Sequence, residues 1–258
     1  MAVVLITGAS SGIGRALARR MAARGHVVGA LARRQPLLEE LVGEIAAAGG
    51  RGLALPCDVT DRQAVHAAIE RARADLGPIE VLVANAGGGR PTHVDSFRAA
   101  QLEAQLQLNV VGAANCIEAV LPDMLARQEG HLVAVSSLAG RRGLPTGEAY
   151  AASKAALDVM MESLRVDLRS RGLAVTVVSP GPVRLKPNSK KSRLFSVDVE
   201  EAAARIEAAI HRRAAWCSFP RTLALALALT HLLPAPVYDR LLAGRGRAPK
   251  PPPATTGD

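Results

Sequence analysis

The chain has 258 residues, of which 49% are hydrophobic and only 2% aromatic, and its formal net charge is +9. This length suits one large α/β domain, whose core must be filled by Ala, Leu, Val and Ile. The basic residues are spread along helical segments, without a helix-turn-helix, zinc-finger or aromatic-plus-basic strand pattern, so we interpret the charge as solvated helix faces and expect no nucleic-acid partner.

The cysteines and the amino-terminal residues indicate the cellular compartment of the protein. Cys57, Cys116 and Cys217 are odd in number and lack Cys-x-x-Cys or metal-ligand spacing, which favours a reducing compartment and indicates no metal site. Met1 runs directly into an apolar segment, without the basic region of a secretion signal. We therefore expect a cytoplasmic protein.

The first apolar run, residues 2–7, is followed by a glycine-rich turn and then by helical periodicity over residues 15–24. A strand, a glycine turn and a helix in this order let the backbone approach a pyrophosphate, with the amide groups of the helix directed at it. A glycine turn alone can be mere loop punctuation, but at the first strand-to-helix junction it predicts dinucleotide binding. The residues expected to contact the dinucleotide are Gly8, Ser10, Ser11, Gly12, Ile13 and Gly14.

The second predicted strand, residues 26–32, ends in Ala32 and is followed by Arg33 and Arg34. In dinucleotide folds an acidic residue about 20 positions beyond the glycines binds the adenosine ribose, whereas an arginine there accommodates the 2′-phosphate of NADP. Ala32 takes the acidic position, so the two arginines predict NADP rather than NAD. The alternative is that both are the solvated start of a helix over residues 35–48.

Polar motifs follow the next two predicted strands. Residues 52–56 lead into Asp58 and Val59, after which Thr60 or Asp61 is expected to cap a helix that runs to residue 76. Helix capping is also an alternative role for the Asp58 motif itself. Residues 80–84 lead into the small-residue motif Asn85, Ala86 and Gly87.

A long helical pattern covers residues 96–128, with breaks expected near Gly112 and Pro122. Asn109 lies inside an otherwise apolar turn of this pattern. A buried asparagine must have its amide satisfied, which a backbone carbonyl or a trapped water would do.

The fifth predicted strand, residues 131–136, places Ser137 at its carboxyl end, where open α/β sheets bind their ligands. Ser136 is expected to face the other way, because successive strand side chains alternate. Further along, Tyr150 and Lys154 are four residues apart in a segment of helix formers, so they would share one helical face.

A lysine beside a tyrosine is expected to lower the pKa of the phenol. One positive charge at ~4 Å supplies about 4 kcal/mol at an effective dielectric of ~20, and each unit of pKa requires about 1.4 kcal/mol. The pair then exchanges protons near neutral pH. The alternative is a chance pair, since any exposed helix brings such side chains together.

Together these motifs closely resemble the short-chain dehydrogenase/reductase family, in the family's order, over roughly the first 185 residues. The resemblance implies that Tyr150 protonates a carbonyl oxygen, that Ser137 orients that oxygen, that Lys154 holds the nicotinamide ribose and lowers the tyrosine pKa, and that Asn109 completes a water relay. It also implies that Asp58 and Val59 contact the adenine, and that Asn85, Ala86 and Gly87 brace the sheet beneath the cofactor. The nicotinamide end would be held by Pro180, Gly181 and Val183, although Leu185 replaces a threonine usual in the family.

Beyond a sixth predicted strand at residues 173–179, strands and helices no longer alternate regularly along the chain. Residues 186–196 are basic and are either solvated or part of a substrate-side lid. An amphipathic helix over residues 198–213 and a seventh strand at 214–219 follow. Residues 245–258 are rich in Pro, Gly and charge, which predicts a disordered tail.

The segment of residues 222–233 is apolar on nearly every side but too short to span a bilayer. It would line an apolar substrate cleft, lie in a subunit interface, or lie on a membrane through residues 221–242. We favour the first two, because the polar face of a surface-lying helix is nearly missing.

The sequence thus predicts one α/β domain over residues 1–244, a Rossmann-type doubly wound parallel sheet of about seven strands with helices on both faces, in which residues 184–244 form a lid and terminal helices. The implied activity is NADP(H)-dependent hydride transfer between the nicotinamide and a carbonyl or secondary alcohol of a hydrophobic small molecule, by a homo-oligomer. The alternatives are a catalytically silent NADP(H)-binding sensor or scaffold, and a sugar-nucleotide epimerase, which shares the Tyr-x-x-x-Lys pair.

Overall fold

The computed structural model describes residues 1–185 and 195–244; most of the predicted lid and the predicted tail lie outside the described residues. Seven strands form one sheet in the order β3-β2-β1-β4-β5-β6-β9, and every neighbouring pair is parallel. This confirms the predicted sheet. Its strands are β1 (Val3–Thr7), β2 (Val27–Ala32), β3 (Arg51–Pro56), β4 (Val81–Ala84), β5 (Gly130–Val135), β6 (Leu173–Pro180) and β9 (Trp216–Phe219).

The strand order reverses between β1 and β4, because β2 and β3 extend the sheet to one side of β1 and the later strands extend it to the other. At such a switch point the loops after neighbouring strands diverge to opposite faces and leave a crevice at the carboxyl ends. The glycine turn, the two arginines, Asp58, Asn85 and Ser137 all follow strands at this edge.

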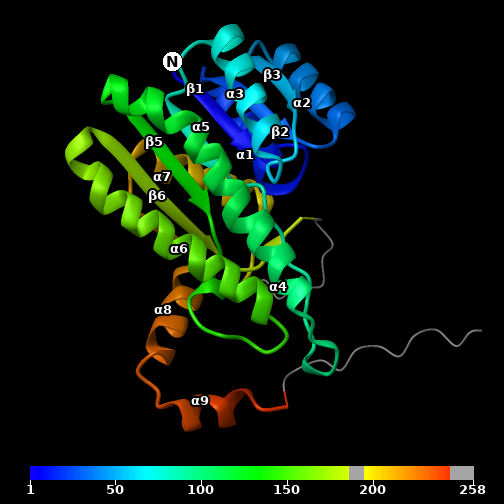
Figure 1. Ribbon diagram of the computed structural model, residues 1–258, viewed down its shortest axis with the longest axis vertical. Coiled ribbons are helices and arrows are strands. Elements are labelled where there is room, and N and C mark those ends of the chain that lie inside the picture. Colours follow the sequence, from blue (N-terminus) through cyan, green and yellow to red (C-terminus); the bar gives the residue numbers. More distant parts are fainter. Residues whose placement is uncertain (186–194, 245–258) are drawn as a thin grey trace, which may run out of the picture.

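Helices cover both faces of the sheet (Figure 1). The strand side chains alternate between two core clusters: Val4 and Ile6 of β1 pack with one set of helices, and Val3 and Leu5 pack with the other. Burial on both faces explains why the strands are continuous apolar runs. One face carries α1 (Gly12–Ala23), α2 (Gln35–Ala47) and α7 (Val199–His211), and the other carries α3 (Arg62–Leu76), α5 (Gly112–Arg127) and α6 (Glu148–Leu168).

The long helical pattern comprises α4 (Ala99–Leu106), the π-helical η2 (Gln107–Val111) and α5. The break expected near Gly112 is this π-helical turn, which widens the helix without ending it. The break expected at Pro122 is wrong, because Pro122 lies inside α5; its missing N–H removes only one backbone hydrogen bond from a helix held by packing. Residues 99–127 are long and apolar enough to cross a membrane, but half of the apolar stretch is buried against the rest of the domain.

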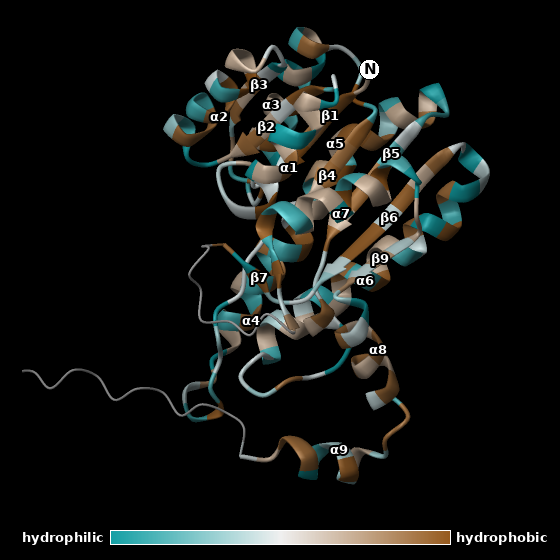
Figure 2. Cartoon of the chain, turned by 180° about the vertical axis from the view of Figure 1, so that it is seen from behind, coloured by the Kyte–Doolittle hydropathy of each residue, from teal (hydrophilic) through white to brown (hydrophobic). Residues whose placement is uncertain are grey.

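Two features at the carboxyl edge complete the described fold. A second sheet, absent from the sequence prediction, pairs β7 (Val183–Arg184) with β8 (Val197–Asp198). The apolar terminal segment forms α8 (Arg221–Thr230), which contacts β9, and is followed by α9 (Ala235–Leu242). Figure 2 shows both helices at one end of the molecule, away from the amino terminus.

Candidate active site

The glycine turn is shaped by close backbone contacts. Gly8 and Gly12 have φ values of +68° and +58°, in the region that favours glycine. A Cβ on Gly14 would lie 2.5 Å from the carbonyl oxygen of Gly8 and 2.6 Å from Nδ2 of Asn85, which leaves no room for a side chain. The turn therefore presents backbone and the amino-terminal end of α1 to the crevice, as pyrophosphate binding requires.

Asn85 ties the ends of β1 and β4 together across the switch point. Its Nδ2 donates to the carbonyl oxygen of Thr7 at 2.8 Å. The Thr7 hydroxyl in turn accepts the backbone N–H groups of Asn85 at 3.0 Å and Ala86 at 2.8 Å. These contacts account for the small-residue motif as a brace of the sheet beneath the crevice.

The two arginines after β2 differ in how firmly they are held. One guanidinium nitrogen of Arg34 donates to the hydroxyls of Ser10 at 2.9 Å and Ser11 at 2.8 Å, so Arg34 lies against the glycine turn. The Arg33 side chain is 75% exposed and lies 3.7 Å from the carboxylate of Asp58. Both arginines line the crevice together with Ala32.

Asp58 is fixed by a local turn. Its Oδ1 accepts the backbone N–H of Thr60 at 3.0 Å and the Thr60 hydroxyl at 2.8 Å. Burial acts to raise the pKa of this carboxyl, but the Thr60 hydrogen bonds and the charge of Arg33 prevail and lower it. The helix cap is Asp61, which accepts the N–H of Ala64 at 3.0 Å, so Asp58 and Val59 are left to line the crevice.

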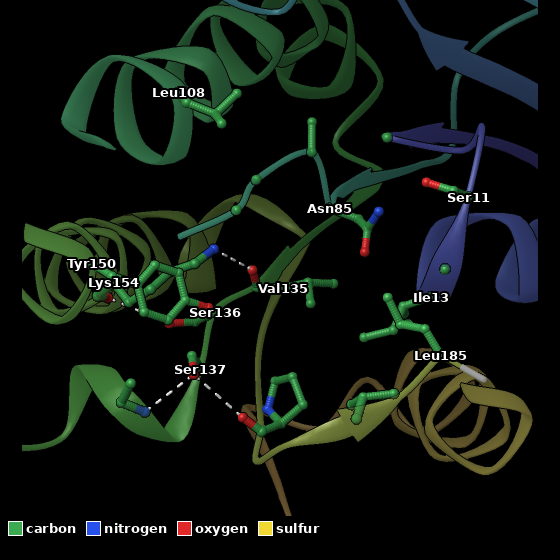
Figure 3. A pocket seen from close by; sticks show the side chains of 18 of the residues that line it. Ser11, Ile13, Asn85, Leu108, Val135, Ser136, Ser137, Tyr150, Lys154 and Leu185 are labelled. Atoms are coloured by element: carbon green, nitrogen blue, oxygen red, sulfur yellow. Dashed lines mark hydrogen bonds between the residues drawn. The ribbon is translucent and has the colours of Figure 1, made fainter. Parts of the chain in front are cut away.

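Ser137 directs its hydroxyl into the crevice at the end of β5. Its oxygen accepts the N–H of Ala139 at 3.1 Å, and its hydroxyl donates to the carbonyl of Pro180 at 3.5 Å (Figure 3). Ser136 engages α6 instead, donating to the carbonyl of Lys154 at 3.3 Å. Both serines line the cavity, so the expected alternation holds only for their hydroxyls: that of Ser136 bonds to α6, and that of Ser137 does not.

Tyr150 and Lys154 lie one turn apart on α6, with the lysine Nζ 5.9 Å from the centre of the tyrosine ring. Lys154 donates to the carbonyl of Val135 at 2.9 Å. Burial lowers its pKa to about 8, and the nearby carboxylate of Asp158 opposes that shift. The shared face predicted from the four-residue spacing is thus confirmed.

The expected fall in the tyrosine pKa is wrong for this arrangement. Burial raises the pKa of Tyr150, and the hydrogen bond with Ser137 offsets only part of that rise. Removing a phenolate from water costs free energy, and the four-residue spacing of Tyr150 and Lys154 does not reveal that cost.

Asn109 lies in the π-helical turn and is buried. Its Oδ1 accepts the N–H of Gly88 at 3.0 Å, and its Nδ2 donates to the Gly88 carbonyl at 3.0 Å and to the Ser153 hydroxyl at 2.9 Å. The amide is therefore satisfied by the Gly88 backbone, one of the two solutions expected, together with the side chains of Ser153 and Gln105. A Cβ on Gly87 would lie 2.7 Å from Asn109 Oδ1 and 3.2 Å from Lys154 Nζ, so glycine at this position lets both side chains approach the crevice.

Most of these residues line one cavity of about 820 Å³. Tyr150 and Lys154 lie on the side opposite Ser11 and Ile13 (Figure 3). The expected cofactor residues that line it are Gly8, Ser10, Ser11, Gly12, Ile13, Arg33, Arg34, Asp58, Val59, Asn85, Ala86, Gly87, Pro180, Gly181 and Val183. Gly14 and Asn109 lie outside this lining and act through their contacts with Gly8 and Gly88.

Sequence reasoning posed a cleft wall within residues 222–233 but missed Leu108, Leu138 and Leu144 in the cavity lining and a glycine beneath the tyrosine. A Cβ on Gly89 would lie 2.4 Å from Cδ2 of Tyr150, so Gly89 permits the ring to pack on the backbone. The run of glycines after Gly87 was the available signal. The apolar lining comprises Leu108, Leu138, Leu144, Leu185, Leu223 and Leu227, contributed by segments far apart in the chain.

A doubly wound sheet with a glycine turn at its switch point defines a dinucleotide-binding domain. The chain matches the family model of short chain dehydrogenases over residues 2–195. It therefore belongs to the short-chain dehydrogenase/reductase family, whose members are oxidoreductases that act on small molecules with a nicotinamide cofactor.

Individual relatives agree with this membership. The chain is 42% identical over 237 residues to an uncharacterized oxidoreductase of Myxococcus xanthus, covering 91% of this chain and 94% of that protein. It is 35% identical over 216 residues to a fatty acyl-CoA reductase of Acinetobacter baylyi, covering 82% and 73%. A crystal structure of a short-chain dehydrogenase from Streptomyces avermitilis superposes with a TM-score of 0.80 at 30% identity, covering 93% and 94% of the two chains.

Proposed function

We propose that this chain is an NADP(H)-dependent oxidoreductase that interconverts a carbonyl group and a secondary alcohol on a hydrophobic small molecule. The observation that carries the proposal is the meeting of Ser137, Tyr150 and Lys154 in the same cavity as the glycine turn. A proton donor and a cofactor cradle in one cavity are the parts that carbonyl reduction requires.

The cavity suits a nicotinamide dinucleotide. The glycine turn and the start of α1 would hold the pyrophosphate, since a Cβ at Gly14 would collide with the Gly8 backbone. Asp58 and Val59 would contact the adenine, and Pro180, Gly181 and Val183 the nicotinamide end. When bound, the cofactor supplies the hydride that the carbonyl carbon receives.

The protein residues then have separate roles in reduction. Ser137 hydrogen-bonds the carbonyl oxygen and aligns it with Tyr150, which donates the proton. The raised pKa of Tyr150 keeps the phenol protonated at neutral pH, as an acid must be. Lys154, whose pKa is about 8, remains largely charged there and would hold the ribose hydroxyls. Asn109 would orient the water that returns a proton.

NADP is favoured over NAD at the adenosine end. Arg34 already lies on the hydroxyls of Ser10 and Ser11, and Arg33 stands beside it at the rim. A guanidinium and two hydroxyls would bind the 2′-phosphate through charge-assisted hydrogen bonds, and Ala32 supplies no carboxylate to bind a free ribose.

The apolar lining supports a hydrophobic substrate. Leu144 from the loop before α6 and Leu223 and Leu227 from α8 line the cavity that Ser137 and Tyr150 share. A substrate chain packed there would bury apolar surface at about 25 cal/mol per Å². The 35% identity to a fatty acyl-CoA reductase is consistent with an acyl-chain or similarly apolar substrate.

We further propose that residues 1–244 act as one domain in a cytoplasmic homo-oligomer. Val159 and Val166 on the outer face of α6 are exposed apolar residues that a second copy would cover. The three free cysteines fit a reducing compartment.

The direct test is a screen of carbonyl compounds of increasing chain length with NADPH and NADH, followed at the absorbance of the reduced nicotinamide. We expect NADPH oxidation that rises with the apolar length of the substrate. Binding of NADPH without turnover of any carbonyl would favour the silent sensor instead.

A further inference from the structure

Helix α8 carries apolar side chains on two opposite faces. Leu223 and Leu227, one turn apart, line the cavity. Leu225 and Leu229, also one turn apart, are 62% and 54% exposed. One short helix therefore separates the substrate end of the cavity from the outside, with leucines toward both.

The outer apolar face continues into α9. Leu232 in the intervening turn and Val237 and Leu241 on α9 are exposed, and neither helix contains a buried residue. Figure 2 shows these hydrophobic stretches at the end of the molecule where α8 and α9 lie. We call Leu225, Leu229, Leu232, Val237 and Leu241 the outer apolar face.

Contacts of Tyr238 hold α9 against the loop before α6. The Tyr238 hydroxyl donates to the carbonyl of Gly143 at 2.6 Å. The guanidinium of Arg142 lies 3.7 Å from the centre of the Tyr238 ring and donates to the carbonyl of Leu233 at 3.3 Å. With α9 held in this way, Tyr238 is partly buried while Val237 and Leu241 are exposed.

The charges around the outer apolar face are mostly positive, which favours an anionic partner. Exposed Arg221 and Arg240 flank it, Asp239 is the single acidic residue of residues 220–244, and the sequence of residues 245–250 adds three basic residues and no acidic one. Two copies meeting through this face by a twofold axis would bring like charges together. Anionic lipid headgroups complement the arginines, while the aliphatic side chains enter the boundary of the acyl chains.

We propose that the outer apolar face docks on an anionic lipid bilayer, with α8 as the partition between that bilayer and the substrate end of the cavity. Taken alone, the sequence of α8 disfavours membrane contact, because the polar face of a surface-lying helix is nearly missing. In the fold, the second apolar face of α8 is taken up by the cavity, and α9 supplies the polar side chains. That an apolar substrate enters the cavity from the bilayer past α8 rests on the proposed function. The docking of the outer apolar face on the bilayer does not.

Flotation of the full-length protein with vesicles tests the docking. We expect wild type to float with vesicles of mixed phosphatidylcholine and phosphatidylglycerol and to float poorly with phosphatidylcholine alone. Leu225→Glu/Leu229→Glu should lower the bound fraction about tenfold or more, because two leucines that would enter the bilayer are replaced by charged side chains. The matched control Leu225→Met/Leu229→Met should float like wild type, because it keeps the face apolar.

Three results would overturn the proposal: no flotation of wild type, equal flotation of the glutamate variant, or a glutamate variant of lower oligomeric mass, which would assign the face to a second copy. NADPH binding and turnover of a short, water-soluble carbonyl should be unchanged in the glutamate variant, since Leu225 and Leu229 lie outside the cavity lining. If wild type floats with vesicles but none of the carbonyls tested supports NADPH oxidation, the proposed function fails and the docking stands.

Discussion

Replacing Arg34 with alanine tests how the protein distinguishes NADPH from NADH. Arg34 is held at 2.9 Å and 2.8 Å from the hydroxyls of Ser10 and Ser11, which preorganises it for a phosphate. A charge-assisted hydrogen bond contributes about 1.5–3 kcal/mol, which corresponds to about 10- to 150-fold in affinity at 1.4 kcal/mol per tenfold. Arg33→Ala should fall at the lower end of this range, because the Arg33 side chain is 75% exposed and its charge is screened by solvent.

The assay is fluorescence titration of each variant with NADPH and with NADH. Arg34→Ala should raise the Kd for NADPH by about 10- to 150-fold. The Kd for NADH should stay within about threefold of wild type, since NADH lacks the phosphate. Arg19→Ala is the matched control: Arg19 lies on the exposed side of α1, 3.8 Å from Glu44, and outside the cavity lining, so it reports any general effect of losing one positive charge. Equal losses for the two cofactors, or a wild type that binds NADH as tightly as NADPH, would refute the assignment.

Three further perturbations have definite expected outcomes. Gly14→Ala should lower both the Tm and the affinity for NADPH, at a cost of about 1–3 kcal/mol in the free energy of unfolding, because its Cβ would lie 2.5 Å from the Gly8 carbonyl; unchanged melting would contradict the tight turn. Carbonyl reduction should fall as the pH rises through about 8, where Lys154 loses its charge, and Asp158→Asn should move that fall to lower pH; a kcat/KM profile that is flat well above pH 8 would argue against the role of Lys154. Leu227→Asn should raise KM for long apolar carbonyls and leave short ones unaffected, and a uniform change would remove α8 from the substrate end.

The sheet, its order of elements and the meeting of the candidate catalytic residues could be predicted from the sequence. Buried parallel strands are continuous apolar runs, and the carboxyl ends of such strands meet at one edge, so residues from Ser10 to Val183 converge without any knowledge of side-chain packing. The spacing of Tyr150 and Lys154 depends on helical periodicity alone, which also made it predictable.

The remaining features depend on tertiary contacts. Pro122 stays inside a helix because packing outweighs one lost hydrogen bond, which the local proline rule does not consider. The pKa of Tyr150 rises because the fold buries it, and burial is not a property of the four-residue spacing. Leu223 and Leu227 line the cavity only because α8 folds back toward the carboxyl edge of the sheet. The sequence alone therefore left three alternatives for this segment: a cleft wall, a subunit interface or a membrane contact.

Turnover of Tyr150→Phe on one carbonyl substrate identified by the screen, measured beside its NADPH affinity, tests the central claim most directly. Loss of the hydroxyl removes the proposed proton donor and leaves a ring that still packs over Gly89, so we expect kcat to fall about 10²- to 10⁴-fold while the Kd for NADPH stays close to that of wild type. Turnover equal to wild type would contradict the account, because it would mean that the carbonyl oxygen receives its proton from another group.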